Sequence, residues 1–430
     1  MVSRRRVRQV ELADPPLTES MGSMDRQPPN PLRISAWRFI VTFGTVSLLA
    51  DFVYEGARSV TGPLLAAFGA TGLIVGIVTG VGEAAALLLR LVSGPLADRT
   101  RRFWAWTIAG YALTVISVPT LGYAGALWVA AGLIILERVG KAVRSPAKDA
   151  LLSYATSAIG RGRGFAVHEA LDQFGAVIGP LVVAGMLAIT GTQYGPSLAV
   201  LALPGVVALG LLVWLRSRAP RPMDFEVSPH RSSAKHEPIG RLPRAFWLYA
   251  GFTATTMLGF ATFGLISFHI VEANLLPAAV VPLLYAAVMV VDALAALATG
   301  WAYDRFGPRV LIVLPIVAAT IPAFAFTDGI LAAVAGSLLW GIALGIQEST
   351  LRATVADLVD ARRRSTAYGI FAAIVGVATA GGAALAGALY DVALPLLIVV
   401  TIAIQILAIG LLLTLSMRRF KGGSPAAPRE

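Results

Sequence analysis

Ionisable side chains stand inside the long apolar stretches of this chain, where they could bind and release protons. Asp51 and Glu55 are four residues apart, and Glu83, Arg138 and Asp172 follow in later apolar stretches. A spacing of four places two side chains on the same face of a helix. A carboxyl group in a dry cavity keeps its proton more readily than one in water, and two close carboxyl groups titrate as a coupled pair. We therefore predict that these five residues take part in proton coupling and line a substrate cavity.

Each of these acids has a second interpretation, as one partner of a structural ion pair. Arg58 follows Glu55 by three residues and Asp51 by seven, so it could simply neutralise both carboxylates. Glu83 could pair with a basic group such as Arg138, and Asp172 could be an internal ion-pair partner. A charge at the centre of a membrane costs about 2.5–3.5 kcal/mol and normally faces a cavity or a partner. Both interpretations therefore place these side chains in the protein interior.

A row of cations in the fourth apolar stretch offers a different chemistry, the binding of an anion. Arg138, Lys141, Arg144 and Lys148 recur at spacings of three or four residues, so they follow one side of a helix. An anionic metabolite could bind along this row and be moved in either direction.

The composition indicates which kind of element must position these side chains. The chain has 430 residues, of which 57% are hydrophobic and 14% charged, and its mean hydropathy is +0.75. These values lie outside the range of soluble domains. Apolar stretches of about 18 to 25 residues recur, and a helix of that length crosses roughly 30 Å of hydrocarbon. We therefore predict an all-α integral membrane protein that lies in a lipid bilayer.

Twelve transmembrane helices are predicted, in two groups of six. The expected parts are a disordered arm (1–36), a first bundle (37–215), a linker (216–244), a second bundle (245–415) and a tail (416–430). Basic residues are concentrated in the arm, the linker, the tail and alternate loops, which by the positive-inside rule places both termini in the cytoplasm. The abundance of Ala, Gly and Arg suggests a high-GC bacterial genome, so the expected location is the bacterial cytoplasmic membrane.

Two of the expected cytoplasmic loops carry a similar phrase, GPLADRTRR after the second apolar stretch and GWAYDRFGPR after the eighth. The glycine, aspartate and arginine positions of these phrases are Gly94, Asp98, Arg99 and Arg102 in the first copy and Gly300, Asp304, Arg305 and Arg309 in the second. The repeat indicates a duplicated six-helix unit. Two pseudo-symmetric bundles of this kind can rock about a central site.

The two loop phrases and the six plus six helices resemble the major facilitator superfamily of transporters, over about residues 37–415. The resemblance implies that family's fold and transport by alternating access, with the loop clusters latching the cytoplasmic side when the site faces outward. The segment GAVIGPLVVAG, with Gly175, Gly179, Pro180 and Gly185, resembles a sequence that the family associates with antiporters. The alternative interpretation of this segment is ordinary small-residue helix packing.

The function expected from these patterns is proton-coupled efflux of a small molecule by a protein that works as a monomer. Transport of an anionic metabolite is the alternative, and a receptor or scaffold on the same fold is less favoured. The basic loops and termini are expected to lie against lipid headgroups rather than to bind nucleic acid. The chain has no cysteine, no apparent catalytic grouping, no phosphate-binding loop and no histidine cluster with metal-ligand spacing, so we expect no enzyme, cofactor or metal site.

Overall fold

The computed structural model describes residues 34–157, 161–221, 225, 242–360 and 363–422. Within these residues the regular structure is helical, which confirms the predicted fold class. The first half of the molecule comprises α1–α9, and the second half comprises α10–α16.

The helices of the first half are α1 (Ala36–Arg58), α2 (Thr61–Ala67), α3 (Gly72–Leu88), α4 (Arg90–Thr100), α5 (Phe103–Leu121), α6 (Leu127–Ser157), α7 (Arg161–Ile189), α8 (Tyr194–Ala199) and α9 (Ala202–Arg218). Hydroxyl side chains begin two of them: Ser35 accepts from the Arg38 amide at 3.4 Å, and Thr71 accepts from the Ile74 amide at 3.3 Å. Each cap satisfies an amide that has no partner inside its helix.

The elements of the second half are α10 (Arg244–Leu258), α11 (Phe263–Glu272), α12 (Val281–Phe306), the 3-10 helix η2 (Gly307–Ile312), α13 (Val313–Ala325), α14 (Ile330–Leu358), α15 (Arg364–Val392) and α16 (Leu394–Gly422). Gly307, with a φ of 66°, ends α12 in the left-handed conformation that glycine adopts without strain. Thr262 starts α11 by accepting from the Leu265 amide at 3.3 Å.

Ten stretches of the described chain are helices long and apolar enough to cross a membrane. One of them runs through both α12 and α13, so it contains two of the predicted spans. The helix α6 is not among the ten; it carries Glu137, Arg138, Lys141 and Arg144, which interrupt its apolar sequence. The multi-pass membrane prediction is confirmed, while the count of twelve stays a prediction.

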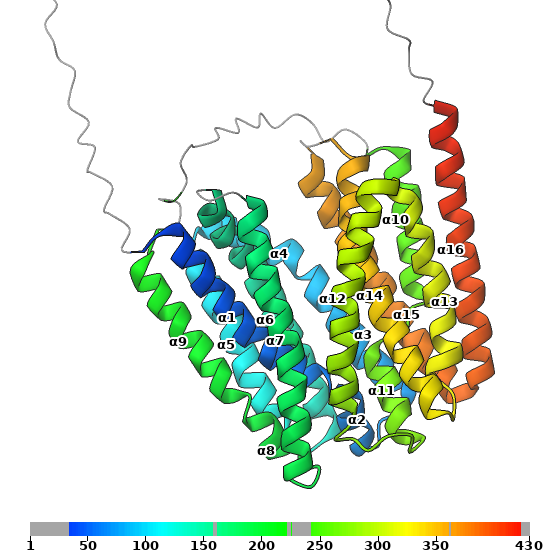
Figure 1. Cartoon of the computed structure of the whole chain (residues 1–430), viewed down its shortest axis with the longest axis horizontal. Coiled ribbons are helices and arrows are strands. Elements are labelled where there is room, and N and C mark those ends of the chain that lie inside the picture. The colour runs from blue at the N-terminus through cyan, green and yellow to red at the C-terminus, as the bar shows by residue number, and fades with distance from the viewer. Residues whose placement is uncertain (1–33, 158–160, 222–224, 226–241, 361–362, 423–430) are drawn as a thin grey trace, which may run out of the picture.

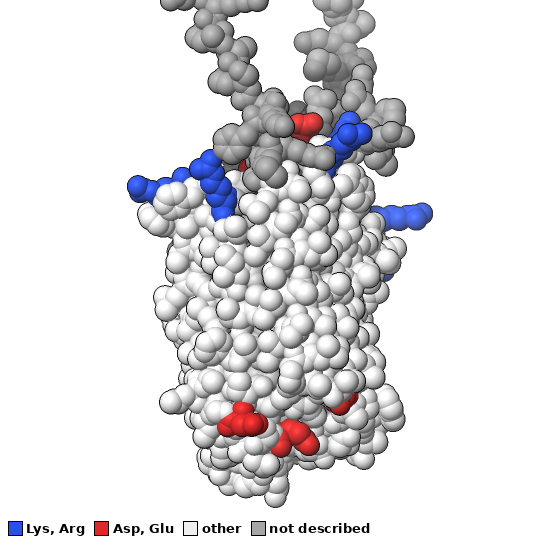
Figure 2. Space-filling model, turned by 90° about the vertical axis from the view of Figure 1, so that its right-hand side faces the viewer, with Lys and Arg blue, Asp and Glu red and all other residues white. Residues whose placement is uncertain are grey.

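The two halves lie side by side. The N-terminal end of α1 and the C-terminal end of α16 lie at the same end of the molecule (Figure 1). We call this end, which the sequence predicts to be cytoplasmic, the inner end. The helices α2 and α11 pack together near the opposite, outer end, and α3 packs along α15. On the face shown in Figure 2, Lys and Arg lie towards the inner end together with some Asp and Glu, further Asp and Glu lie near the outer end, and a wide belt between the two ends has almost no charged side chain. Such a belt suits lipid contact.

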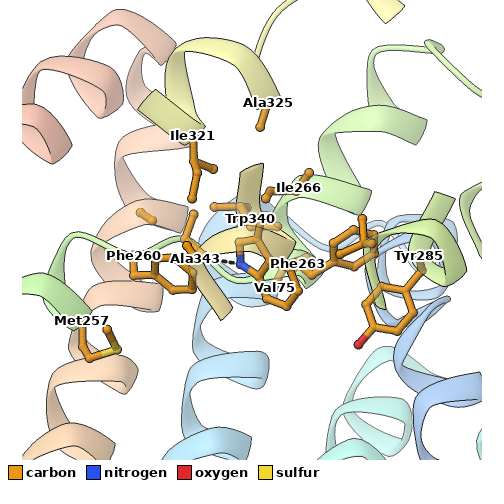
Figure 3. Packing of buried hydrophobic residues seen from close by; sticks show 14 of the residues in the cluster. Val75, Met257, Phe260, Phe263, Ile266, Tyr285, Ile321, Ala325, Trp340 and Ala343 are labelled. Carbon is orange, nitrogen blue, oxygen red and sulfur yellow. Dashed lines mark hydrogen bonds between the residues drawn. The ribbon is translucent and has the colours of Figure 1, made fainter. Parts of the chain in front are cut away.

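An aromatic cluster lies where α11, α12 and α14 meet (Figure 3). The Phe263 ring centroid is 4.6 Å from that of Tyr285 and 5.5 Å from that of Trp340, and Phe260 stacks on Trp340 at 6.1 Å. Trp340 donates its indole N–H to the Ala261 carbonyl at 2.9 Å, which satisfies its polar atom in the core. The cluster fixes the Tyr285 ring, whose hydroxyl points out of the cluster (Figure 3).

Candidate functional site

A chain of ion pairs, here called the central network, connects three helices of the first half. In it, Arg58 of α1 lies 3.5 Å from Glu55 and 3.0 Å from Glu83 of α3, measured between nitrogen and carboxylate oxygen. On α6, Arg138 lies 3.3 Å from Glu83 and 3.5 Å from Glu137. Three carboxylates therefore share two guanidinium groups, so the network has capacity for an added proton.

A glycine leaves space for Arg138 of this network, and the ring of Tyr54 contacts both Arg138 and Lys141. A Cβ at Gly82 would lie 3.0 Å from Cγ of Arg138, so glycine lets the arginine stem pass beside α3. The guanidinium carbon of Arg138 lies 4.6 Å from the centroid of the Tyr54 ring, and Nζ of Lys141 lies 4.0 Å from it. Contact with the negative face of an aromatic ring offsets part of the cost of burying these charges.

The central network is bound directly to the second half of the molecule. Tyr285 of α12 donates its hydroxyl to Oε2 of Glu55 at 2.6 Å. Nearby, the hydroxyls of Thr79 and Thr262 lie 2.9 Å apart across the same boundary between α3 and α11. A cavity of about 20 Å³ beside Arg58 and both threonines is large enough for a water molecule. Glu55 therefore belongs both to the charged central network and to the contact between the two halves.

The outer ends of the two halves are held together by a helix cap. The carboxylate of Asp391 at the end of α15 accepts from the amides of Gly72, at 2.7 Å, and Leu73, at 2.8 Å. These amides begin α3, where the helix dipole favours an anion. One turn further along α3, Gly76 lies directly against the Ala383 carbonyl of α15. Together with the central contacts, these interactions close the outer side.

Replacing Asp391 with asparagine is expected to weaken this closure by about 0.5–1 kcal/mol, because the neutral amide lacks the charge that favours the helix start. Because the chain has no cysteine, a single cysteine at Ala383 reports outer opening through its reaction with a membrane-impermeant thiol reagent. We expect the reaction to be severalfold faster in Asp391→Asn. Asp328→Asn, at an exposed outer acid, is the matched control. Equal rates in both variants would contradict a capping role.

The residues of the repeated loop phrase lie at the inner end. Asp98, Arg99 and Arg102 are exposed and form no ion pair with another described residue. Unlike these three residues, Gly94 packs against another helix, since it faces Pro146 of α6. In the second copy Gly300 is partly buried, Asp304, Arg305 and Arg309 are exposed, and the Arg305 guanidinium lies over the rings of Trp301 and Phe306. A latch formed by these loops in another state stays a prediction.

The antiporter-like segment of α7 forms a close contact with α1. A Cβ at Gly175 would overlap the Leu48 carbonyl, and a Cβ at Gly179 would overlap the Phe52 carbonyl. Pro180 is buried beside this contact, whereas Gly185 is exposed and has open space around it. This is the packing that the small-residue interpretation describes, and the direction of transport stays a prediction.

The predicted pair Asp51 and Glu55 is divided between two clusters. Glu55 belongs to the central network, whereas Asp51, half-buried one turn closer to the inner end, has no ion pair within 4 Å among the described residues. The charges that act on Asp51 include those of Asp172 and Lys141. Asp172 itself lies 3.9 Å from Nζ of Lys148, as the ion-pair interpretation requires. Asp51 and Asp172 thus form an inner cluster, and the charge of Asp51 still acts on Glu55.

His168, Glu169 and Asp172 offer donor atoms within 4.8 Å of one another, an arrangement that could hold a cation. The sequence analysis did not identify this group, because a histidine and an acid four residues apart are common on helices. The Nε2 atom of His168 already lies 2.7 Å from the Ser47 hydroxyl, and the Lys148 ammonium lies beside Asp172. A nearby cation disfavours metal binding, so this group is a poor metal site.

The cation row of α6 is divided by these contacts. Arg138 and Lys148 are ion-paired, whereas Lys141 and Arg144 have no carboxylate within 4 Å among the described residues. Arg144 donates to the Thr114 hydroxyl at 2.7 Å, and its guanidinium lies 4.8 Å from the centroid of the Tyr111 ring. Lys141 and Arg144 thus lack a carboxylate within 4 Å among the described residues, but Arg144 is only 3% exposed and its guanidinium is occupied by Thr114 and Tyr111.

Sequence reasoning missed the roles of Tyr285 and Asp391. Tyr285 is one aromatic residue among many in apolar helices, and nothing in its sequence position indicates a contact with an acid 230 residues away. Asp391 could have been noticed as an acid at the outer end of a predicted span, but its partner amides are more than 300 residues away.

Sequence comparisons identify similar proteins over most of the chain. The sequence model of the Major Facilitator Superfamily matches residues 45–291 and 248–429. An uncharacterized protein of Mycobacterium tuberculosis (strain ATCC 25618 / H37Rv) is 64% identical over 387 residues, which are 90% of this chain and 95% of that protein. An uncharacterized MFS-type transporter of Methanocaldococcus jannaschii is 24% identical over 366 residues, 82% of this chain and 88% of that protein.

Solved transporter structures share the fold at low sequence identity. A bacterial homolog of the human lysosomal transporter Spinster, in an inward-facing and unoccupied conformation, has a TM-score of 0.73 and 15% identity, covering 93% of this chain and all of that one. The nucleoside transporter NupG has a TM-score of 0.65 and 14% identity, covering 90% of this chain and 100% of that one.

Proposed function

Because the chain belongs to the Major Facilitator Superfamily of transporters, we propose that it expels a small molecule in exchange for protons. The observation that carries this proposal is the hydrogen bond from Tyr285 to Glu55, which joins a buried charge network to the opposite half of the molecule. Transport by alternating access requires the two halves to separate at such contacts.

Protonation of Glu55 would act on the contact between the halves. An ionised carboxylate accepts a hydrogen bond about twice as strongly as a neutral group. Adding a proton to Glu55 therefore weakens its bond from Tyr285 and its attraction to Arg58, 3.5 Å away. By linkage, a conformation in which these contacts are broken binds the proton more tightly. This reciprocity supplies the coupling that the proposed exchange needs.

Proton movement in proteoliposomes tests the proposal. A pH gradient is imposed, lipophilic cations and organic anions are added in turn, and lumenal pH is followed with a dye. We expect at least one compound to move protons with the natural chain and to lose this effect in Asp51→Asn and Glu55→Gln. The exposed Asp328→Asn variant is the matched control and should behave as the natural chain does. Undiminished proton-driven transport in both acid variants would rule out this pair of residues.

The proposed setting is the bacterial cytoplasmic membrane, with both termini inside and a monomer as the working unit. The gathering of Lys and Arg at the inner end in Figure 2 supports this orientation. The fold and the relatives favour a transporter over an enzyme.

Transport of an anionic metabolite is a second candidate. It is favoured by Lys141 and Arg144, which have no carboxylate within 4 Å among the described residues. Competition of organic anions against lipophilic cations in the proteoliposome experiment distinguishes the two substrate classes.

A further inference from the structure

Asp292 of α12 is a buried acid without an ion pair among the described residues. Its residue surface is 2% exposed, and its Oδ1 atom has no hydrogen-bond partner. No Lys, Arg or His of the described residues lies within 4 Å to form an ion pair with it. By contrast, the acids Glu55, Glu83 and Glu137 are each held by an arginine of the central network.

Asp292 lies on the same helix as Tyr285, whose hydroxyl contacts the other half of the molecule. Asp292 follows Tyr285 by seven residues, so the two side chains lie on nearly the same face of α12, about 10.5 Å apart along its axis. The α12 backbone is fixed there, because Gly345 of α14 lies directly against the Asp292 carbonyl. Asp292 therefore lies two turns closer to the inner end than the bond from Tyr285 to Glu55.

The charges that act on Asp292 come from α14, α7 and α1 and are mostly acidic. They are Glu348 of α14, Glu169 of α7, and Glu55 and Arg58 of α1. Arg58 already contacts two other carboxylates, at 3.5 Å and 3.0 Å. Glu348 and Glu169 are exposed, whereas Asp292 is almost fully buried. A buried carboxylate without an ion pair is costly, whereas a neutral carboxylic acid is accepted there.

The repeat gives no structural reason for an acid at this position. A shift by 206 residues, the distance between the two loop phrases, carries Asp292 onto Ala86 in the first half. The first half therefore forms its equivalent helix with an alanine. An acid that is costly to bury and is not needed for the repeated fold is a candidate for function.

We propose that Asp292 is the group that carries the coupled proton, an inference that rests on the proposed proton-coupled function. In the state described here, which is closed at the outer side, the carboxyl group holds the proton. When the two halves separate at their inner ends, water from the inner side reaches the carboxyl group and the proton leaves to that water, which is the inward direction that exchange for an expelled molecule requires. The central network then serves as the contact that opens and closes, and Asp292 serves as the carrier.

Infrared difference spectroscopy tests this assignment on the full chain in liposomes without any substrate. Spectra are compared between acidic and alkaline buffer, in water and in heavy water, because a protonated carboxyl group has a C=O stretch separate from the bands of carboxylates. We expect one such band to titrate in the natural chain, to be lost in Asp292→Asn and to be shifted but retained in Asp292→Glu. Asp328→Asn, which removes an exposed aspartate, should leave it unchanged.

The possible outcomes separate this inference from the function on which it rests. Loss of the band in Asp292→Asn alone supports the assignment, and the retained band in Asp292→Glu excludes general misfolding as its cause. A band that persists in Asp292→Asn but disappears in Asp51→Asn overturns the assignment and leaves proton coupling intact. The absence of any titrating carboxyl band in the natural chain would overturn the proton-coupled function itself.

Discussion

Replacing Arg138 with methionine is expected to lower the free energy of unfolding by about 3–5 kcal/mol, because it leaves the buried carboxylate of Glu137 without its cation, while Glu83 keeps its contact with Arg58. The guanidinium of Arg138 lies 3.3 Å from Glu83 and 3.5 Å from Glu137, and its side chain is only 9% exposed. Methionine preserves most of the volume of the side chain, so the loss is electrostatic rather than a cavity. Equilibrium unfolding of the purified protein in detergent measures the change.

Two companion variants identify the cause of that loss. Arg305→Met removes an arginine whose guanidinium lies over exposed aromatic rings at the inner end, so it should change stability by less than about 0.5 kcal/mol. Combining Arg138→Met with Glu137→Gln removes the stranded charge and should recover much of the stability. If Arg138→Met unfolds like the natural chain, the central network is not a buried ion-pair system.

Replacing Gly76 with leucine is expected to prevent closure of the outer side and to abolish transport. A Cβ at this position would overlap the Ala383 carbonyl and lie 3.3 Å from Cα of Gly387, so a leucine side chain has no space between α3 and α15. Overpacking of this kind costs about 1–3 kcal/mol or more. The outer-closed state should therefore lose roughly tenfold to hundredfold in population relative to a state in which the outer ends are apart.

The state of the outer side can be read directly in the Gly76→Leu variant. A single cysteine in place of Ala380, which packs against Gly80 of α3, should react rapidly with a membrane-impermeant thiol reagent once the outer ends separate. Gly210→Leu is the matched control, because a Cβ at Gly210 of α9 meets nothing within 4 Å. Slow labelling and normal transport in Gly76→Leu would show that α3 and α15 do not need to approach closely.

The fold class follows from local properties of the sequence. Composition and the recurrence of long apolar stretches predicted a membrane protein of helices, and the structure and the family comparison confirm this. The prediction works because the cost of placing a residue in hydrocarbon depends mainly on that residue, so it can be summed along the chain. The summed cost of placing residues in hydrocarbon is least informative for α6, because its charges are stabilised by partners on other helices.

The sequence predicted which residues of the candidate site lie in the interior, but not which of them pair with one another. The sequence indicated that Asp51, Glu55, Glu83, Arg138 and Asp172 lie in the interior, and the structure places each of them buried or partly buried. It did not indicate that Glu55 and Asp51 belong to different clusters. That division depends on the rotation of α1 against α3, α6 and α7, which the spacing within a single helix leaves open.

The sequence by itself determined the helical membrane fold, the repeated loop phrase and the presence of buried acids, because each depends on residue type and local spacing. The tertiary structure alone decided that Tyr285 binds Glu55, that Asp391 caps α3 and that Asp292 has no ion-pair partner in the described chain. The first two contacts join residues that are hundreds of positions apart in the sequence. They depend on how packed helices are rotated and shifted against one another, and many rotations satisfy the same apolar pattern.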